Sequence, residues 1–331
     1  MSRTGTLLGT LFAALTLLSA RPALCARAPL ASERLIQIST DRDTAYIVPV
    51  TIGPLKNLLF LVDTAATRTV ITPAVRNAAA LKSNEATMEE VAGAGGGISA
   101  ECFVLPSLAI QGAVQRDLHV VVLQIDSAKT WIGRSLDGIL GADYLRNYDV
   151  RLDGKSHTLE LTEISAHAAV PERANAGYYN RVPFELVGGG FMVLPVSLNG
   201  REVMAVLDTG SSRTVLNSRA ADLAGLAREA PEAVLTAGVD NVEIRLGRQR
   251  LKRMEFAGMT ADNEMVSVGN LPIFRQFGLQ DRPAAILGAR ALQNREALIS
   301  YSAHLLFVER RPDDLPPNPI PEGHRQLQEA H

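Results

Sequence analysis

The chain contains an internal duplication, and this feature constrains its fold more than any other. Residues 58–71 (LLFLVDTAATRTVI) are repeated as residues 203–216 (VMAVLDTGSSRTVL), at a displacement of 145 from Asp63 to Asp208. A second block, Gly-Ile-Leu-Gly-Ala at 138–142, is repeated as Ala-Ile-Leu-Gly-Ala at 285–289, at a displacement of 147 from Ile139 to Ile286. Two blocks repeated in the same order predict two similar lobes.

The lobes are predicted to span residues 33–165 and 177–310, with a linker at 166–176. Apolar runs in both lobes are short, rich in Val, Ile and Leu, and separated by Gly, Asn and Pro, which favours a mostly β fold. A short helix is expected after each aspartate, capped by Thr72 with Pro73 in its first turn, or by Asn217 or Ser218. Another is expected after each Ile-Leu-Gly. Residues 311–331 are rich in proline and predict a disordered tail.

Composition excludes several classes of protein. The 331 residues carry 33 Lys and Arg against 35 Asp and Glu, a formal net charge of −2, so a nucleic-acid partner is not expected. Cys25 and Cys102 are too few for a cysteine-based metal site, and no histidine has a partner at zinc-binding spacing. We therefore expect neither a metal nor an organic cofactor.

The first residues predict export. Arg3 precedes an uncharged run over 7–20 that is dominated by Leu and Ala, and small residues follow near Cys25. We interpret residues 1–26 as a cleaved signal peptide, because Arg21 interrupts the run before it reaches the length of a membrane anchor. The mature chain would then be periplasmic or secreted, with no integral membrane span.

Each duplicated block places an aspartate where an apolar strand ends. An unpaired carboxylate at the end of a buried strand is unfavourable by several kcal/mol, so Asp63 and Asp208 must be hydrogen-bonded, paired or functional. A single Asp-Thr loop is most simply a turn in which the aspartate accepts backbone N–H groups. The repetition, followed each time by an Ile-Leu-Gly block, favours a functional pair instead.

These motifs resemble those of retropepsin-like and pepsin-like aspartic proteases, in particular bacterial sequences with two fused lobes. The resemblance implies two β-barrel lobes whose aspartate loops meet, with Asp63 and Asp208 as a catalytic dyad acting on peptide or protein substrates. It also implies that Thr64 and Thr209 hydrogen-bond across the interface. The blocks Ile139, Leu140, Gly141 and Ile286, Leu287, Gly288 would pack beneath their own loops. Because one chain supplies both aspartates, a functional monomer is expected.

The two loops differ at the residues that follow each Asp-Thr. Ala65 stands where the family usually has glycine, whereas the second copy has Gly210 and Ser211. A Cβ at residue 65 can obstruct the close approach that glycine allows, so a distorted or inactive site is an open alternative. If the Ser211 hydroxyl donates to Asp208, that carboxylate is favoured as the ionised member of the pair.

A glycine-rich segment predicts a flap over the cleft. Gly93, Ala94, Gly95, Gly96 and Gly97 precede alternating apolar residues, which is typical of a mobile hairpin tip that enters a strand. A phosphate-binding loop would require a helix after these glycines, and a strand pattern follows instead. Residues 235–246, with Gly238 at the turn, are a weaker candidate for the matching hairpin of the second lobe.

Three functions are consistent with this sequence. The first is an exported aspartic endopeptidase that activates water with Asp63 and Asp208. The second is a catalytically impaired protein that keeps the protease fold and binds peptides between the lobes. In the third, the lobes are assembly modules and the aspartate loops are structural turns.

Overall fold

The computed structural model describes residues 34–37, 39–41, 45–82, 85–93, 96–126, 133–164, 177–227, 232–237 and 243–314. The predicted signal peptide, the linker at 166–176 and residues 315–331 lie outside this part of the chain. Ala94, Gly95 and Gly238 also lie outside it. None of the described helices has the length and hydropathy needed to cross a bilayer.

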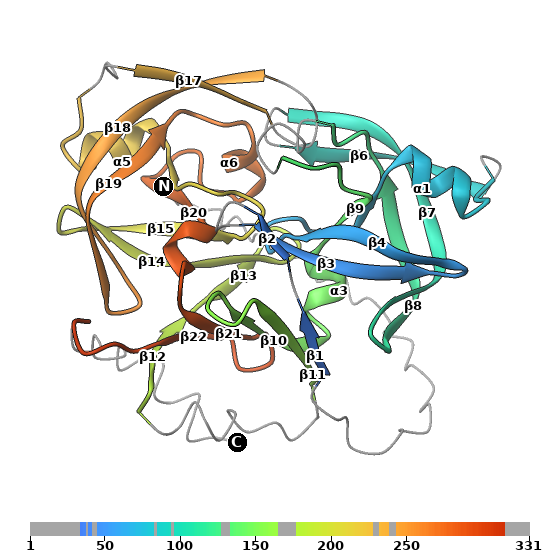
Figure 1. Ribbon diagram of the computed structural model, residues 1–331. Helices are drawn as coiled ribbons and strands as arrows, with labels where there is room; N and C mark the ends of the chain where they lie inside the picture. Colours follow the sequence, from blue (N-terminus) through green and yellow to red (C-terminus); the bar gives the residue numbers. More distant parts are fainter. Residues whose placement is uncertain are drawn as a thin grey trace, which may run out of the picture. The chain divides into compact units, whose positions relative to one another are not determined.

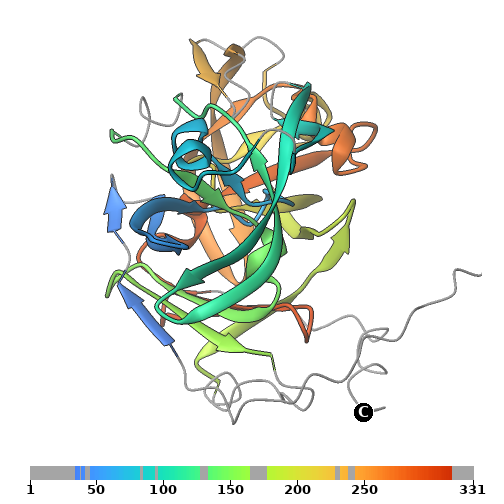
Figure 2. The same cartoon turned by 90° about the vertical axis from the view of Figure 1, so that its right-hand side faces the viewer.

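The N-terminal half forms an eight-stranded sheet, drawn in blue to green in Figure 1. In spatial order the strands are β2 (Ser39–Asp41), β3 (Ala45–Ile52), β4 (Leu55–Val62), β9 (Gly138–Leu140), β5 (Val70–Ile71), β8 (Ala113–Val122), β7 (Gly96–Ile110) and β6 (Thr87–Gly93). Most neighbours are antiparallel, but β4 runs parallel to β9 and β5 runs parallel to β8. Figure 2 shows the long antiparallel hairpin of β7 and β8 in teal and green.

The C-terminal half forms a second eight-stranded sheet with the same strand order. Its strands are β13 (Glu185–Val187), β14 (Phe191–Leu198), β15 (Arg201–Asp208), β20 (Ala284–Gly288), β16 (Val215–Leu216), β19 (Met259–Val268), β18 (Glu243–Phe256) and β17 (Glu232–Ala237). Each strand occupies the place of its sequence counterpart in the first sheet. The predicted duplication is therefore a duplication of topology, and the mostly β fold is confirmed.

A third sheet is shared by both halves. Its order is β1 (Arg34–Gln37), β11 (Thr158–Glu163), β10 (Tyr148–Asp153), β21 (Glu296–Ser300), β22 (Leu305–Glu309) and β12 (Tyr179–Pro183). The halves meet where β10 pairs antiparallel with β21. On either side of this junction the equivalent strands follow in the same order, which gives the sheet an approximate two-fold symmetry. The sequence motifs did not predict this sheet.

Burial follows the side-chain alternation of the strands. In β3 and β14 the pattern is fully buried at first and then alternates, so one face of each strand packs inward along its whole length. The largest apolar cluster takes residues from all three sheets, among them Val48, Val150, Leu194 and Ile299. Two smaller clusters belong mainly to one lobe each. The lobes are thus joined by a continuous apolar core as well as by backbone pairing.

The short helices begin at the predicted caps. Helix α1 (Pro73–Ala78) starts after Thr72, whose Oγ1 accepts a hydrogen bond from the Val75 N–H at 3.3 Å. Helix α5 (Ser218–Leu223) is capped by Asn217, not by Ser218, and the Ala220 N–H donates to Asn217 Oδ1 at 2.8 Å. Helix α3 (Ala142–Leu145) and the 3-10 helix η2 (Ala289–Leu292) follow the two Ile-Leu-Gly blocks, as expected. Helix α6 (Ile273–Gln276) was not predicted.

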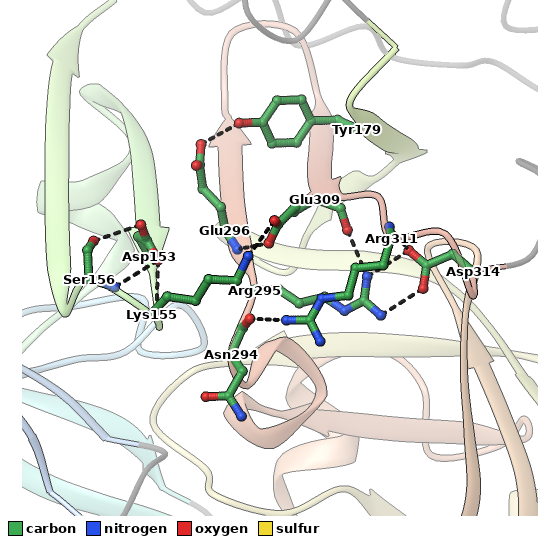
Figure 3. A network of polar contacts seen from close by, with 10 residues as sticks. All are labelled: Asp153, Lys155, Ser156, Tyr179, Asn294, Arg295, Glu296, Glu309, Arg311 and Asp314. Carbon is green, nitrogen blue, oxygen red and sulfur yellow. Dashed lines mark hydrogen bonds and ion pairs between the residues drawn. The ribbon is translucent and has the colours of Figure 1, made fainter.

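The segment predicted to be a disordered tail begins with a turn that hydrogen bonds fix in place. The prediction of disorder is therefore wrong for residues 311–314. Arg295 donates to both carboxylate oxygens of Asp314 at 2.7 Å, and the Arg311 N–H donates to Asp314 Oδ2 at the same distance. Figure 3 shows this contact beside the Lys155–Glu309 ion pair, which joins the two halves at 2.5 Å. The proline count could not reveal the turn, because the turn is bound by Arg295, a partly buried arginine directly before β21 of the shared sheet.

Candidate active site

Both aspartates lie at the ends of equivalent strands. Asp63 directly follows β4, and its N–H donates to the Leu140 carbonyl oxygen of the parallel strand β9 at 3.0 Å. Asp208 is the last residue of β15, opposite Gly288 in the parallel strand β20. The hydrophobic strands thus fix where each aspartate leaves the sheet. Both side chains are half-buried.

Four hydrogen bonds join the two loops, and they come in matched pairs. Thr64 Oγ1 donates to the Leu207 carbonyl oxygen at 2.7 Å, and Thr209 Oγ1 donates to the Val62 carbonyl oxygen at 2.7 Å. Each hydroxyl also accepts the other threonine's backbone N–H at 3.1 Å. Both threonines are buried. The cross-interface role that the resemblance implied for Thr64 and Thr209 matches this geometry.

Backbone amides hold each carboxylate in its loop. Asp63 Oδ1 accepts the N–H groups of Ala65 at 2.8 Å and Ala66 at 3.0 Å. Asp208 Oδ1 accepts the Ser211 N–H at 2.9 Å. These donors stabilise negative charge, so the loops are suited to hold an ionised carboxylate. A hydrogen bond between the two carboxyl groups contributes to the pKa of each.

The two carboxyl groups are electrostatically unequal. Burial raises the pKa of Asp63, and the amides of Ala65 and Ala66 oppose this rise. Burial raises the pKa of Asp208 well above its ordinary range, and the negative charge of Asp63 raises it further. Burial and their mutual contact thus favour a state in which the two carboxyl groups hold one proton between them.

The hydrogen bonds of Ser211 correct the role predicted for its hydroxyl. Ser211 Oγ donates to the Arg213 carbonyl oxygen at 2.9 Å, and only the Ser211 backbone N–H is bonded to Asp208. The hydroxyl therefore does not favour ionisation of Asp208. The partner of a loop hydroxyl depends on the local backbone path, which the sequence pattern did not specify.

Gly210 lies against the carboxyl group of the other lobe. A Cβ built on Gly210 would be 2.3 Å from Asp63 Oδ2 and 2.4 Å from Asp63 Cγ. No side chain can occupy that position, so the glycine is required for the close approach of the loops. In the first loop the matching residue is Ala65, whose methyl group packs against an apolar cluster of the second lobe.

The two Ile-Leu-Gly blocks lie beneath their own loops, as the resemblance implied. Residues 139–141 and 286–288 are buried. A Cβ on Gly141 would be 2.6 Å from the carbonyl carbon of Arg68, and a Cβ on Gly288 would be 2.6 Å from that of Arg213. The next residue bonds the loop directly, since the Ala142 N–H donates to Ala66 O at 2.7 Å and the Ala289 N–H to Ser211 O at 2.8 Å.

A β-hairpin stands at the position predicted for the flap. Strands β6 and β7 pair antiparallel down to Gly93 opposite Gly96, and β6 contacts helix α6 of the other lobe. Of the predicted tip, Gly93, Gly96 and Gly97 are described. In the second lobe β17 and β18 form the matching hairpin, with Ala237 opposite Glu243. The covering role of either hairpin stays a prediction.

Sequence reasoning missed Asp143, which supports the first loop, and Tyr301, which lies within electrostatic reach of Asp63. Asp143 accepts the Thr69 N–H at 2.9 Å and the Thr69 hydroxyl at 2.7 Å, and Thr69 Oγ1 accepts the Gly141 N–H at 3.2 Å. Tyr301 is buried after β21, and its raised pKa reflects this burial first and the charge of Asp63 second. An acid at the start of a helix was the only sequence signal for Asp143, and the second copy has Arg290 there.

Two equivalent β lobes joined at paired Asp-Thr loops define a two-lobed protein of the retropepsin-like class. The chain belongs to the aspartyl protease family, whose sequence model matches residues 48–144 and again residues 194–291. Each match contains one Asp-Thr loop and one Ile-Leu-Gly block. The family and the fold support a protease-like function.

Two solved structures match this chain with different coverage. A retropepsin-like aspartic protease from Rickettsia conorii is 19% identical over 40% of this chain and 91% of that chain, with a TM-score of 0.32. Basic 7S globulin from soybean is 10% identical over 85% of this chain and 95% of that chain, with a TM-score of 0.46. A comparison with curated proteins finds no match.

Proposed function

We propose that this chain is an aspartic endopeptidase in which Asp63 and Asp208 form the catalytic dyad. The observation that carries the proposal is the symmetric set of four hydrogen bonds between Thr64 and Thr209 and the opposite strands, because it brings one aspartate from each lobe into a single half-buried site. Two carboxyl groups so close share one proton at working pH.

The chemistry follows from the two protonation states. The ionised carboxylate takes a proton from a bound water, and the resulting hydroxide attacks the peptide carbonyl carbon. The protonated carboxyl polarises the carbonyl oxygen and transfers its proton as the tetrahedral intermediate forms. The carboxyl group that took the water proton then protonates the departing nitrogen, while the other carboxylate accepts a hydroxyl proton of the intermediate. The C–N bond breaks, and the dyad returns to its starting protonation state. No covalent bond to the enzyme is needed, and each lobe contributes one acid.

Cleavage of an unstructured protein tests this function. Purified mature protein is incubated with casein from acidic to neutral pH, with and without a statine-type peptide, whose hydroxyl mimics the attacking water. Cleavage is expected in the wild type and is lost in Asp63→Asn, in Asp208→Asn and with the inhibitor. Circular dichroism establishes that both variants are folded. Unchanged cleavage in either folded variant would contradict the proposal.

A catalytically impaired peptide-binding protein is the alternative, and Ala65 is the residue that favours it. The methyl group occupies a position that is glycine in the other loop, yet the Ala65 N–H still bonds Asp63 and the threonine bonds remain complete. Binding of the statine-type peptide without any cleavage of casein would support this alternative. If the folded protein neither binds nor cleaves, the aspartate loops are structural turns.

Export and a monomeric state are part of the same proposal. Arg3 and the uncharged run over 7–20 support a signal peptide ending near residue 26, followed by a periplasmic or secreted chain. The presence of both aspartates in one chain supports a monomer. N-terminal sequencing of the protein recovered from a bacterial periplasm tests the first point, and sedimentation of the active protein tests the second.

A further inference from the structure

The two aspartate loops differ in what each presents to the carboxyl group of the other lobe. Gly210 presents bare backbone to Asp63, at a distance that excludes any Cβ. Ala65 stands at the matching place in the first loop. The matched threonine bonds, at 2.7 and 3.1 Å in both directions, relate the loops by an approximate two-fold axis. This symmetry puts residue 65 on the side of Asp208, but because Ala65 carries a Cβ it cannot approach that carboxyl group as closely as Gly210 approaches Asp63.

The surroundings of Ala65 agree with that placement. Ala65 packs against the apolar cluster of the second lobe that includes Val206, Val215 and Ile286. Val206 lies on β15, which carries Asp208, Ile286 lies on its neighbour β20, and Val215 lies on β16, which pairs with β20. Ala66, the next residue, packs instead against the cluster of its own lobe. The Ala65 methyl group therefore lies on the side of the second lobe.

An apolar group beside a carboxyl group removes water and disfavours its charged form. We propose that Ala65 is a positioning residue that makes the two carboxyl groups unequal, because its methyl group excludes water from the carboxyl group of Asp208. Asp208 then keeps the shared proton and polarises the substrate carbonyl, and Asp63 activates the water. This inference rests on the proposed function. Among the described residues, Asp63 is the charged group that acts on Asp208, and the titratable Tyr301 lies within electrostatic reach of Asp63.

The pH dependence of kcat/KM provides the first test. On the basic limb of the pH profile, kcat/KM falls because the dyad loses its shared proton. The Ala65 methyl group moves this loss to higher pH, because it disfavours the ionised form of Asp208. In Ala65→Gly the basic limb is expected to move to lower pH by about 0.5 to 1 unit, a three- to tenfold lower kcat/KM at the wild-type midpoint. Ala220→Gly, which removes a buried methyl group of the second lobe on helix α5 and away from the aspartate loops, is the matched control and keeps the wild-type limb position. The inference would be overturned if the basic limb of Ala65→Gly coincided with that of the wild type, or if Ala220→Gly shifted the limb by the same amount.

Binding of a statine-type peptide provides a second test that needs no cleavage. Asparagine can donate a hydrogen bond as protonated Asp208 does, but it cannot carry the charge assigned to Asp63. Asp208→Asn should therefore bind the peptide about tenfold more tightly than Asp63→Asn, the size expected for one charge-assisted hydrogen bond. Adding Ala65→Gly to both variants should narrow this difference. The reverse affinity order, or equal affinities, would overturn the assignment.

The two tests separate failure of this inference from failure of the proposed function. A wild type that neither cleaves casein nor binds the peptide contradicts the dyad itself, and the inference falls with it. A wild type that cleaves, with no effect of Ala65→Gly on the basic limb, contradicts only the role of Ala65. A shifted limb together with tighter binding by Asp208→Asn than by Asp63→Asn supports both.

Discussion

At the scale of single residues, Thr64 and Thr209 are the positions where the interface most clearly requires a side-chain hydroxyl. Each hydroxyl is buried, donates to a carbonyl of the other lobe and accepts an N–H from it, so both of its polar functions are used. A buried N–H or carbonyl left without a partner is destabilising by about 1–3 kcal/mol. The two residues therefore stabilise the lobe interface as well as the dyad.

Replacing one of these hydroxyls is expected to weaken both folding and catalysis. Thr209→Val keeps the side-chain shape but leaves the Val62 carbonyl and the Thr64 N–H unpaired. We expect unfolding in urea to require about 2–4 kcal/mol less free energy, with a larger relative loss of kcat than of peptide binding. Thr209→Ser, which restores the hydroxyl, is the matched control. Equal stability and activity of the two variants would contradict the role assigned to this hydroxyl.

The raised pKa of Asp208 makes a prediction about stability. An unfolded Asp ionises near its ordinary value of 3.8, whereas the folded carboxyl holds its proton to higher pH. Between these values the native state binds more protons, so Asp208 lowers stability as pH rises through this window and the loss persists at neutral pH. Asp208→Asn should therefore raise Tm at pH 7 and leave Tm little changed near pH 3.

Asp153→Asn is a control of opposite sign. Hydrogen bonds from Ser156 and Lys155 lower the pKa of Asp153 despite its burial, so its charge stabilises the fold above pH 3.8 and this contribution is lost as pH falls. Thermal unfolding from pH 3 to 7 should show Asp153→Asn less stable than the wild type at neutral pH. A lower Tm of Asp208→Asn at pH 7 would contradict the placement of its carboxyl in a desolvated pair.

The residues predictable from the sequence are those that the duplication marks twice. Asp63, Asp208 and both threonines stand in repeated blocks, and the structure brings them together. Ser211 was placed correctly, but its hydroxyl bonds the backbone of its own loop. Asp143 and Tyr301 were missed because their relation to the site arises from tertiary structure. Asp143 bonds a threonine 74 residues earlier in the chain, and Tyr301 follows a strand of the shared sheet.

At the scale of elements, each aspartate loop depends on the strand that runs beneath it. The blocks 139–141 and 286–288 are buried and end on a glycine that touches backbone rather than side chains. Backbone atoms cannot move aside as a flexible side chain can. Glycine at these two positions therefore allows each aspartate loop to pack directly on the strand beneath it. Helix caps and hairpins were predictable because their signals are local, whereas α6 has no side-chain cap and follows neither an aspartate loop nor an Ile-Leu-Gly block.

A methyl group at Gly288 should therefore disturb the second aspartate loop. Its Cβ would lie 2.6 to 2.7 Å from three backbone atoms of Arg213, a distance that forces the loop to move. We expect Gly288→Ala to lower the free energy of unfolding by about 1–3 kcal/mol and to reduce kcat. Gly97→Ala is the control, because its Cβ would make an ordinary contact of 3.4 Å with Glu90 Oε2. Equal stabilities of the two variants would contradict the close packing beneath the loop.

The Arg295–Asp314 ion pair fixes the C-terminal end of the described chain. The side chains are 11% and 2% exposed, so each would be left nearly without solvent if the other were removed. Arg295→Met should therefore lower stability by about 3–5 kcal/mol. In Glu255→Gln, which breaks the surface pair with Arg253, the expected loss is much smaller, because solvent screens exposed charges. Urea unfolding of both variants measures the contrast, and similar losses would show that the pair contributes little.

At the scale of the whole described molecule, the shared sheet makes the two halves one folding unit. Its two-fold order arises because each half contributes three equivalent strands, and β10 pairs with β21 over five residue pairs. The sequence predicted two lobes from their repeats, but it could not predict this junction. Pairing between β10 and β21 joins residues about 150 positions apart, and nothing in either strand alone indicates its partner.

This architecture predicts that the covalent linker is dispensable once the protein has folded. A site for a specific protease is placed within residues 166–176, and the purified protein is cut there. Because the shared sheet, the common apolar core and the threonine bonds all cross between the halves, the fragments should stay together as a one-to-one complex that retains casein cleavage. Neither fragment expressed alone should cleave casein, since each contains one aspartate. Separation of the fragments on size-exclusion chromatography without denaturant would show that the linker, rather than the interface, holds the dyad together.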